Sequence, residues 1–135
     1  MTLIEVTVVV AIIALIAGIG VPAILRRLDR TRVRHATAEV VSVLALARAT
    51  AVAREMYVSV IFDAADSAVY LTDGRDTLVA RAVGAIYGVA VASNRDSATY
   101  GPSGLGYGAA NQSIVLRRGD VADTIVISRL GRVRD

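Results

Sequence analysis

Residues 2–25 read TLIEVTVVVAIIALIAGIGVPAIL, and this stretch decides the fold. It has no charged residue from Val6 to Leu25, and 20 helical residues span about 30 Å, the thickness of a bilayer's hydrocarbon core. The residues before it include one Glu and no Arg, unlike the basic start of a secretory signal peptide. The first basic residues, Arg26 and Arg27, follow the apolar run. We therefore expect a membrane-crossing helix whose short basic leader, once ahead of Met1, has been removed.

The composition fits one domain plus an extended element. The chain has 135 residues, of which 55% are apolar, and it has no Cys, which excludes a disulfide framework. Its formal charge is +3, and all 15 basic residues are Arg. Arginine binds phosphate and carboxylate groups with a two-pronged geometry that lysine lacks. In a chain without Lys, however, Arg abundance alone is weak evidence for anion binding.

We predict one long helix from Thr2 to Ala53. Thr2 and Glu5 have the spacing of a capping box, which can start a helix. In the second half, apolar residues recur at helical spacing and are expected to cover a folded domain. This apolar stripe consists of Ala36, Val40, Val43, Leu44, Ala47 and Ala51. The polar residues expected to face outward are Arg34, Thr37, Arg48 and Arg54.

The weakest part of this helix is predicted at Gly18, Gly20 and Pro22. In a helix interior, Gly costs about 1 kcal/mol and Pro about 3 kcal/mol relative to Ala. Pro22 also removes the hydrogen bond to residue 18. One interpretation is the ordinary kink of a membrane helix. The other is a hinge that stays helical in the membrane and extends when the chain assembles.

After Glu55 the pattern changes from helical to strand-like spacing. The expected strands are Met56–Phe62, Ala68–Thr72, Thr77–Val83, Ala85–Ala92, Ser113–Arg117 and Thr124–Arg129. Turns are expected at Asp63–Asp66, Asp73–Gly74, Ser93–Asp96 and Gly119–Asp120, with a loop at Gly101–Gly108. The fold class is thus α+β, with a helix at residues 1–53 and a largely antiparallel β domain at 54–135. Within the helix, residues 1–25 form the membrane or filament-core segment and residues 26–53 the amphipathic half.

The N-terminal sequence resembles that of the type IV pilin superfamily. The residues that carry the resemblance are Thr2-Leu3-Ile4-Glu5-Val6, the uncharged run and Pro22. The resemblance implies a long N-terminal helix on a β domain, a leader cut by a prepilin peptidase, and N-methylation of Met1. Family members usually begin with Phe, so Met1 departs from the pattern while keeping an unbranched apolar side chain.

The rest of the chain is similar to the GspH/FimT branch of this superfamily. The similarity covers the small-residue helix end at residues 47–54, Gly101-Pro102-Ser103-Gly104, the strands around Ile114–Leu116 and Ile125–Ile127, and Gly131-Arg132. It implies a minor pilin, or a pseudopilin of type II secretion, that assembles with copies of itself or other pilins. Some pilins of this superfamily form the main filament, so a major-pilin role stays open. Such a subunit waits in the bacterial inner membrane and then enters a periplasmic or extracellular filament. An alternative is a membrane-anchored β domain that never polymerises.

Glu5 is the one acidic residue next to the apolar run. A carboxylate close to hydrocarbon costs about 2–3 kcal/mol or more unless it is paired. It can cap the helix by accepting the backbone N–H of Thr2. In the family, the corresponding Glu faces the N-terminal amine of a neighbouring subunit. The resemblance therefore implies that Glu5 and Met1 set the register of the filament, because a slip would leave both charges unpaired.

The C-terminal residues Gly131-Arg132-Val133-Arg134 match a Gly-Arg-x-Arg motif. FimT minor pilins that bind DNA during natural transformation carry this motif. In an extended segment, Arg132 and Arg134 would face the same side and could meet successive phosphates. Arg129, Arg117 and Arg118 could add to such a patch. The alternative is an ordinary solvent-facing surface in a chain that uses no Lys.

Nothing in the sequence indicates an enzyme. His35 is the only His, and with no Cys a metal site would need carboxylates alone. The Asp residues fall in predicted turns, where they commonly bond to the backbone. We expect no catalytic residue, no cofactor and no metal.

Overall fold

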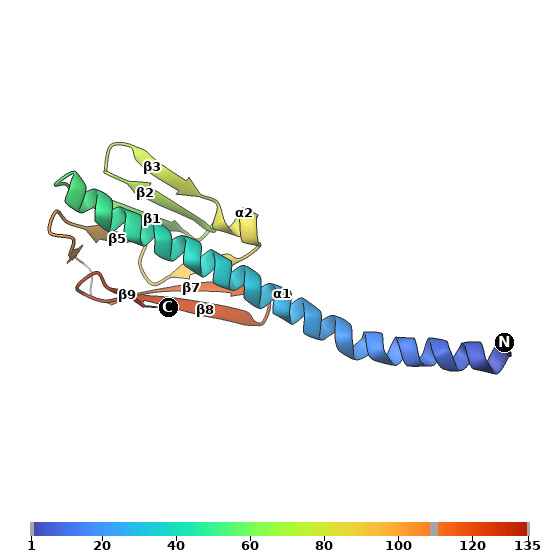
Figure 1. Ribbon diagram of the computed structural model, residues 1–135. Coiled ribbons are helices and arrows are strands. Elements are labelled where there is room, and N and C mark those ends of the chain that lie inside the picture. The colour runs from blue at the N-terminus through green and yellow to red at the C-terminus, as the bar shows by residue number, and fades with distance from the viewer. Residues whose placement is uncertain (1, 109–110, 135) are drawn as a thin grey trace.

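Helix α1 (Leu3–Ala53) extends through the whole structure (Figure 1). The computed structural model describes residues 2–108 and 111–134. The helix starts as predicted, because the Thr2 N–H donates to Oε2 of Glu5 at 3.3 Å. It is continuous across Pro22, and its first half projects away from the rest of the chain. The predicted α+β fold with a long N-terminal helix is confirmed.

The end of α1 is closed by its own backbone. The N–H of Glu55 donates to the carbonyl of Val52, and that of Met56 donates to the carbonyl of Ala51. These are the two bonds of a Schellman motif, which turns the chain out of a helix. The motif needs a left-handed residue, usually Gly, and here Glu55 takes that place with a φ of 52°. The chain therefore leaves the helix sharply and enters the first strand.

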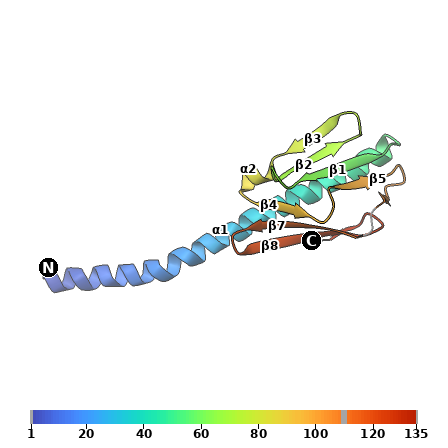
Figure 2. The same ribbon diagram turned by 180° about the vertical axis from the view of Figure 1, so that it is seen from behind.

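Nine strands and one short helix follow α1 in the described part of the chain. Their bounds are β1 Val58–Asp63, β2 Ala68–Thr72, β3 Thr77–Arg81, α2 Val83–Tyr87, β4 Ala90–Ser93, β5 Ser97–Tyr100, β6 Gly106–Tyr107, β7 Gln112–Arg118, β8 Val121–Ile127 and β9 Val133–Arg134. All strand pairs are antiparallel and form two sheets, with the orders β3-β2-β1-β5-β6 and β4-β7-β8-β9. Both sheets lie side by side on the same side of α1 (Figures 1 and 2).

The core forms where the second half of α1 meets the two sheets. The whole predicted helix stripe, from Ala36 to Ala51, is buried. Alternate residues of the strands point at it, as the period of a strand requires. The buried strand residues include Val58, Val60, Phe62, Val69, Leu71, Ala98, Tyr100, Ile114, Leu116, Ile125 and Ile127. One helix therefore joins two sheets that share few direct contacts of their own.

Thr37 corrects the prediction that it faces outward. It is 3% exposed, and its hydroxyl donates to Oδ2 of Asp123 on β8 at 3.0 Å. Helical spacing places Thr37 at the edge of the buried stripe, so the position depends on which strand it meets. A polar side chain is accepted there because Asp123 supplies a hydrogen-bond acceptor.

The prediction of a single strand at Ala85–Ala92 is wrong. The first part of this segment belongs to α2, which ends at Gly88 in a left-handed conformation with a φ of 65°. The N–H of Gly84 donates to the carbonyl of Ser67 at 2.8 Å and fixes the start of this turn of helix. Only residues 90–93 form the strand, β4. A tertiary contact to Ser67 here overrides a local sequence rich in strand-forming residues.

Three strands were not predicted: β5, β6 and β9. Strand β5 follows the predicted turn and pairs with β1, while β6 lies inside the stretch expected as a loop. Both β6 and β9 have only two residues, too few for an alternating pattern. Strand β8 begins three residues earlier than the predicted Thr124, because Val121 pairs with Arg118 across a tight turn.

Candidate assembly and nucleic-acid surfaces

The first half of α1 is an apolar surface that no other described part of the chain covers. It contains a stretch long and apolar enough to cross a membrane, and none of that stretch is buried. Its exposed large side chains are Leu3, Ile4, Val6, Val8, Val9, Val10, Ile12, Ile13, Leu15, Ile16, Val21, Ile24 and Leu25. Such a continuous apolar surface marks a membrane or protein contact.

Glu5 is satisfied locally within the single chain. Its carboxylate accepts the N–H of Thr2, and the next acidic residue along the helix is Asp29. The cap uses one carboxylate oxygen only and leaves Glu5 exposed on the helix surface. Met1, the expected N-methylation site and expected partner of Glu5 in filament register, lies outside the described residues.

Gly18 and Gly20 have no packing role in the single chain. A Cβ at either position would meet nothing within 4 Å. With Pro22 they lie in the continuous helix. The small size of both glycines can therefore matter only when the helix contacts something else or changes shape.

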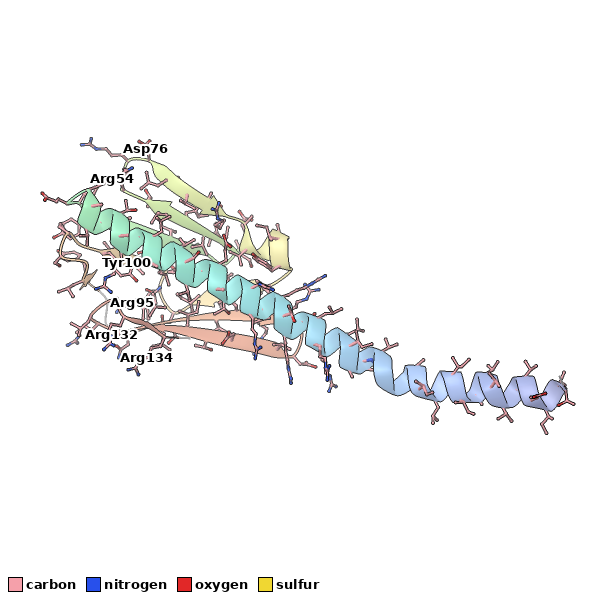
Figure 3. The ribbon with its side chains drawn as sticks, viewed as in Figure 1. Arg54, Asp76, Arg95, Tyr100, Arg132 and Arg134 are labelled. Atoms are coloured by element: carbon pink, nitrogen blue, oxygen red, sulfur yellow. The ribbon has the colours of Figure 1, made fainter. Side chains whose placement is uncertain are left out.

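Arg132 and Arg134 come together at the C-terminal end of the domain (Figure 3). Both are exposed, and with Val126, Ser128 and Leu130 they line a hollow of about 310 Å³. Arg134 pairs with Val126 in the register between β9 and β8. Both arginines thus line one hollow, although only Arg134 lies within β9.

The turn before these arginines is tightly fixed. The N–H of Ser128 donates to the carbonyl of Arg132 at 2.8 Å, and the N–H of Arg132 donates back to Oγ of Ser128 at 3.1 Å. Gly131 has a φ of 75°, and a Cβ there would lie 2.9 Å from Cε1 of Tyr100. The fold alone thus requires the glycine of the Gly-Arg-x-Arg motif.

Arg118 is not part of this C-terminal cluster. Its Nε donates to Oδ1 of Asp29 at 2.6 Å, and its Nη1 donates to the carbonyls of Tyr87 and Gly88. It joins β7 to α1 and to the end of α2, at the opposite end of the hairpin from β9. A side chain held by three acceptors has little left to offer a ligand.

Arg117, unlike Arg118, points outward from β7. It alternates with the buried residues of β7 and is exposed. It lies opposite Ala122, four residues from Val126 along β8, and two strand spacings separate it from β9, so its backbone lies about 16 Å from that of Arg134. Arg129 is exposed in the turn before β9. Of the predicted arginines, the structure thus gathers Arg132 and Arg134, with Arg117 more distant on the same face.

An apolar groove of about 610 Å³ lies beside α1, and the sequence did not lead us to expect it. Its helix side is a second apolar stripe, next to the core stripe. The groove is lined by Val41, Leu44, Ala45, Arg48, Ala49, Val52, Ala53, Tyr100, Gly131 and Val133. The spacing of Val41, Ala45, Ala49 and Val52 could have revealed this stripe, because positions three or four apart share one helix face.

Tyr100 lies in the wall of this groove with its hydroxyl unpaired. It is 1% exposed, and among the described residues its Oη has no hydrogen-bond partner. Burial raises the pKa of the Tyr100 hydroxyl above its usual 10.0, while the positive charge of Arg48 acts in the opposite direction.

No metal-binding cluster of His, Asp or Glu side chains is found within residues 2–108 and 111–134. His35, Glu5 and the turn aspartates are spread along the structure. The described side chains therefore offer binding surfaces.

The fold defines a pilin-like protein. Two crystal forms of the type IV minor pilin FimU of Pseudomonas aeruginosa have this fold. One matches with a TM-score of 0.66 and 16% identity over 78% of this chain and 89% of FimU. The other matches with a TM-score of 0.62 and 15% identity over 75% of this chain and 90% of FimU. The comparison with curated proteins finds no significant match.

The sequence gives the family. Residues 36–131 match the family described as type II transport protein GspH, and the chain belongs to that family. The resemblance to GspH/FimT pilins is confirmed, and the chain is a pilin-like protein of the class that forms type IV pili or pseudopili. Families of this class supply structural subunits.

Replacing Gly131 by Ala is expected to destabilise the domain by at least about 2 kcal/mol, because the left-handed backbone and the nearby Tyr100 ring both oppose a Cβ. Gly74 is the matched control, with a φ of 88° and open space around it. Gly74→Ala should cost only about 1 kcal/mol, from the backbone alone. Denaturant unfolding of the detergent-solubilised chain measures both. Equal losses would refute the role of the Tyr100 contact.

Tyr100→Phe is expected to stabilise the protein at neutral pH by about 1 kcal/mol, because it removes an unpaired buried hydroxyl. The raised pKa means that the folded state holds the Tyr100 proton more tightly than the unfolded state. The pH-dependent part of the stability, which comes from this tighter proton binding, is fully present below the unfolded pKa of about 10. It is lost as the pH rises through the higher folded-state pKa. Thermal unfolding between pH 8 and 11 should therefore show a steeper alkaline loss in the wild type than in Tyr100→Phe. Parallel curves would contradict this assignment.

Proposed function

We propose that this chain is stored in the bacterial inner membrane through residues 1–25 and then assembles into a pilus or pseudopilus filament. The observation that carries the proposal is the exposed apolar half of α1, which continues without a break from the folded domain. Bilayer hydrocarbon can cover this surface first, and the same helices of other subunits can cover it later. The neighbours are copies of this chain or other pilins.

Glu5 and Met1 give the filament its register in this proposal. The carboxylate of Glu5 is the only acidic group in the apolar half, and its local cap occupies one oxygen. Pairing with the amine of Met1 on a neighbouring subunit would satisfy it in one alignment only. Cleavage of a leader by a prepilin peptidase supplies that amine, and N-methylation keeps it basic.

The segment from Gly18 to Pro22 acts as the hinge. It is helical in the isolated chain, as a bilayer requires of backbone groups. Two glycines with open space and a proline make it the least costly place for α1 to extend between packed neighbours.

Glu5→Leu is expected to abolish ordered filaments while leaving membrane insertion intact. The change removes the charge that selects the stagger and makes the helix more apolar. Electron microscopy of sheared surface filaments and membrane fractionation of the same cells measure the two effects.

Thr7→Val is the matched control, because it removes a polar group two residues away without changing charge. Its hydroxyl already bonds the carbonyl of Ile4, so assembly should be normal. Well-ordered filaments from the Glu5→Leu chain would overturn the register role. A wild-type chain found only as isolated anchored monomers would overturn assembly itself.

A second function, DNA binding by a minor pilin, is favoured by the shared placement of Arg132 and Arg134. They line one hollow on an outward face, and Arg117 lies on that face about 16 Å from Arg134. Such a surface suits the phosphates of a nucleic-acid backbone and would bind without sequence preference.

Arg132→Ala with Arg134→Ala is expected to weaken DNA binding and to reduce the slope of log K against log salt by about 1.8 for duplex DNA. Gel-shift titrations of the detergent-solubilised full chain at several salt concentrations measure the slope. Arg54→Ala with Arg75→Ala removes the same charge from exposed positions near the β2–β3 turn and should leave the slope unchanged. An equal change in both variants would show that net charge, and no C-terminal site, governs binding.

A further inference from the structure

Five arginines lie on α1 directly after the apolar half, where the helix approaches the β domain. All five are exposed. We call them the arginine collar: Arg26, Arg27, Arg30, Arg32 and Arg34. Neither filament register nor the C-terminal DNA surface uses them.

The acidic groups of this half of α1 do not neutralise the collar. Residues 26–53 contain two of them, Asp29 and Glu39. Asp29 is held by Arg118 at 2.6 Å, and Glu39 accepts from Nε of Arg81 at 2.8 Å. Both carboxylates are therefore taken by arginines of the β domain.

The facing hairpin offers only two more carboxylates. Asp123 accepts from the hydroxyl of Thr37 and from the N–H of Thr124, and Asp120 is exposed in the turn. Five arginines set against these two aspartates leave an excess of three positive charges. The region therefore attracts anions.

The collar has a direction around the helix. At about 100° per residue, Arg26, Arg27, Arg30 and Arg34 fall within roughly a third of the circumference, and Arg32 lies on the other side. Arg30 and Arg34 face the β8 residues Val121, Ala122 and Asp123 across a hollow of about 310 Å³. This hollow can admit a phosphate-sized headgroup between guanidinium groups.

The position of the collar along the helix axis favours membrane lipids as the source of that phosphate. When residues 6–25 cross the hydrocarbon core, Arg26 and Arg27 emerge at the headgroup level, and Arg34 lies about 12 Å further along the axis. Arginine side chains near a helix end reach back to the interface with their charged heads. A nucleic acid would have to compete at a place where lipid phosphates are already adjacent.

We propose that the arginine collar binds anionic phospholipid headgroups in the leaflet where α1 leaves the bilayer, with one phosphate in the hollow between α1 and β8. The site fixes the depth of the helix and holds the domain against the membrane surface before assembly. It requires only that residues 6–25 enter a bilayer, so it does not depend on filament formation.

The test is native mass spectrometry of the full chain in detergent micelles that contain equal amounts of phosphatidylglycerol and phosphatidylcholine. The wild type should retain phosphatidylglycerol at least tenfold over phosphatidylcholine. Each basic residue near an anionic surface strengthens binding about fivefold, so Arg30→Gln with Arg34→Gln should lower this preference by about 25-fold or to parity. Arg54→Gln with Arg75→Gln, which removes the same charge elsewhere, should leave it within twofold of wild type. Circular dichroism checks that each variant is folded.

Three results would overturn the assignment. One is a wild type without preference, and another is an equal fall in both double variants, which would reduce the effect to net charge. The third is displacement of bound phosphatidylglycerol by inorganic phosphate or a short DNA duplex at equal phosphate concentration. Such displacement would make the hollow a general phosphate site or a nucleic-acid site. Retention of the lipid against both competitors supports the membrane assignment.

Discussion

The burial of one helix face against two sheets holds this protein together. Whereas the short helix α2 contacts mainly β2 and β4 among the strands, the stripe from Ala36 to Ala51 of α1 contacts strands of both sheets. Neither sheet could bury its inner face without it, because each is a single layer. The same helix must also leave the domain with its other half uncovered. Structural stability and the need for an external partner therefore belong to one continuous element.

Different contacts hold the two ends of the domain. Arg118 joins β7 to Asp29 and to the carbonyls after α2, where the helix enters the domain. At the far end, Gly106 and Gly131 let the edges of the two sheets approach each other, with the Cβ position of Gly131 only 3.0 Å from the N of Gly106. This close approach fixes the turn that precedes the exposed C-terminal arginines.

The long helix, its buried stripe and the α+β class could be predicted because they depend on periodic patterns over many residues. The strand expected at Ala85–Ala92 failed because a hydrogen bond to Ser67, distant in sequence, selects a turn of helix. Strands of two residues carry no period at all. Among the candidate site residues, Arg132 and Arg134 could be paired from strand alternation. Arg118 could not be separated from them, because its partner Asp29 lies 89 residues away in the chain. The groove at Tyr100 was missed because its second wall comes from β5 and β9, which were not expected.

The ion pair between Asp29 and Arg118 has a mechanical consequence. Among the described residues it is the side-chain bond between α1 and the β domain that lies nearest the N-terminus. A tensile force on the projecting half, directed along the helix axis, reaches this bond before the packed stripe behind it. The ion pair lies where α1 enters the β domain, and the same Arg118 guanidinium also donates to two backbone carbonyls, those of Tyr87 and Gly88. Load is thereby shared between α1, α2 and β7 before any core contact has to shear.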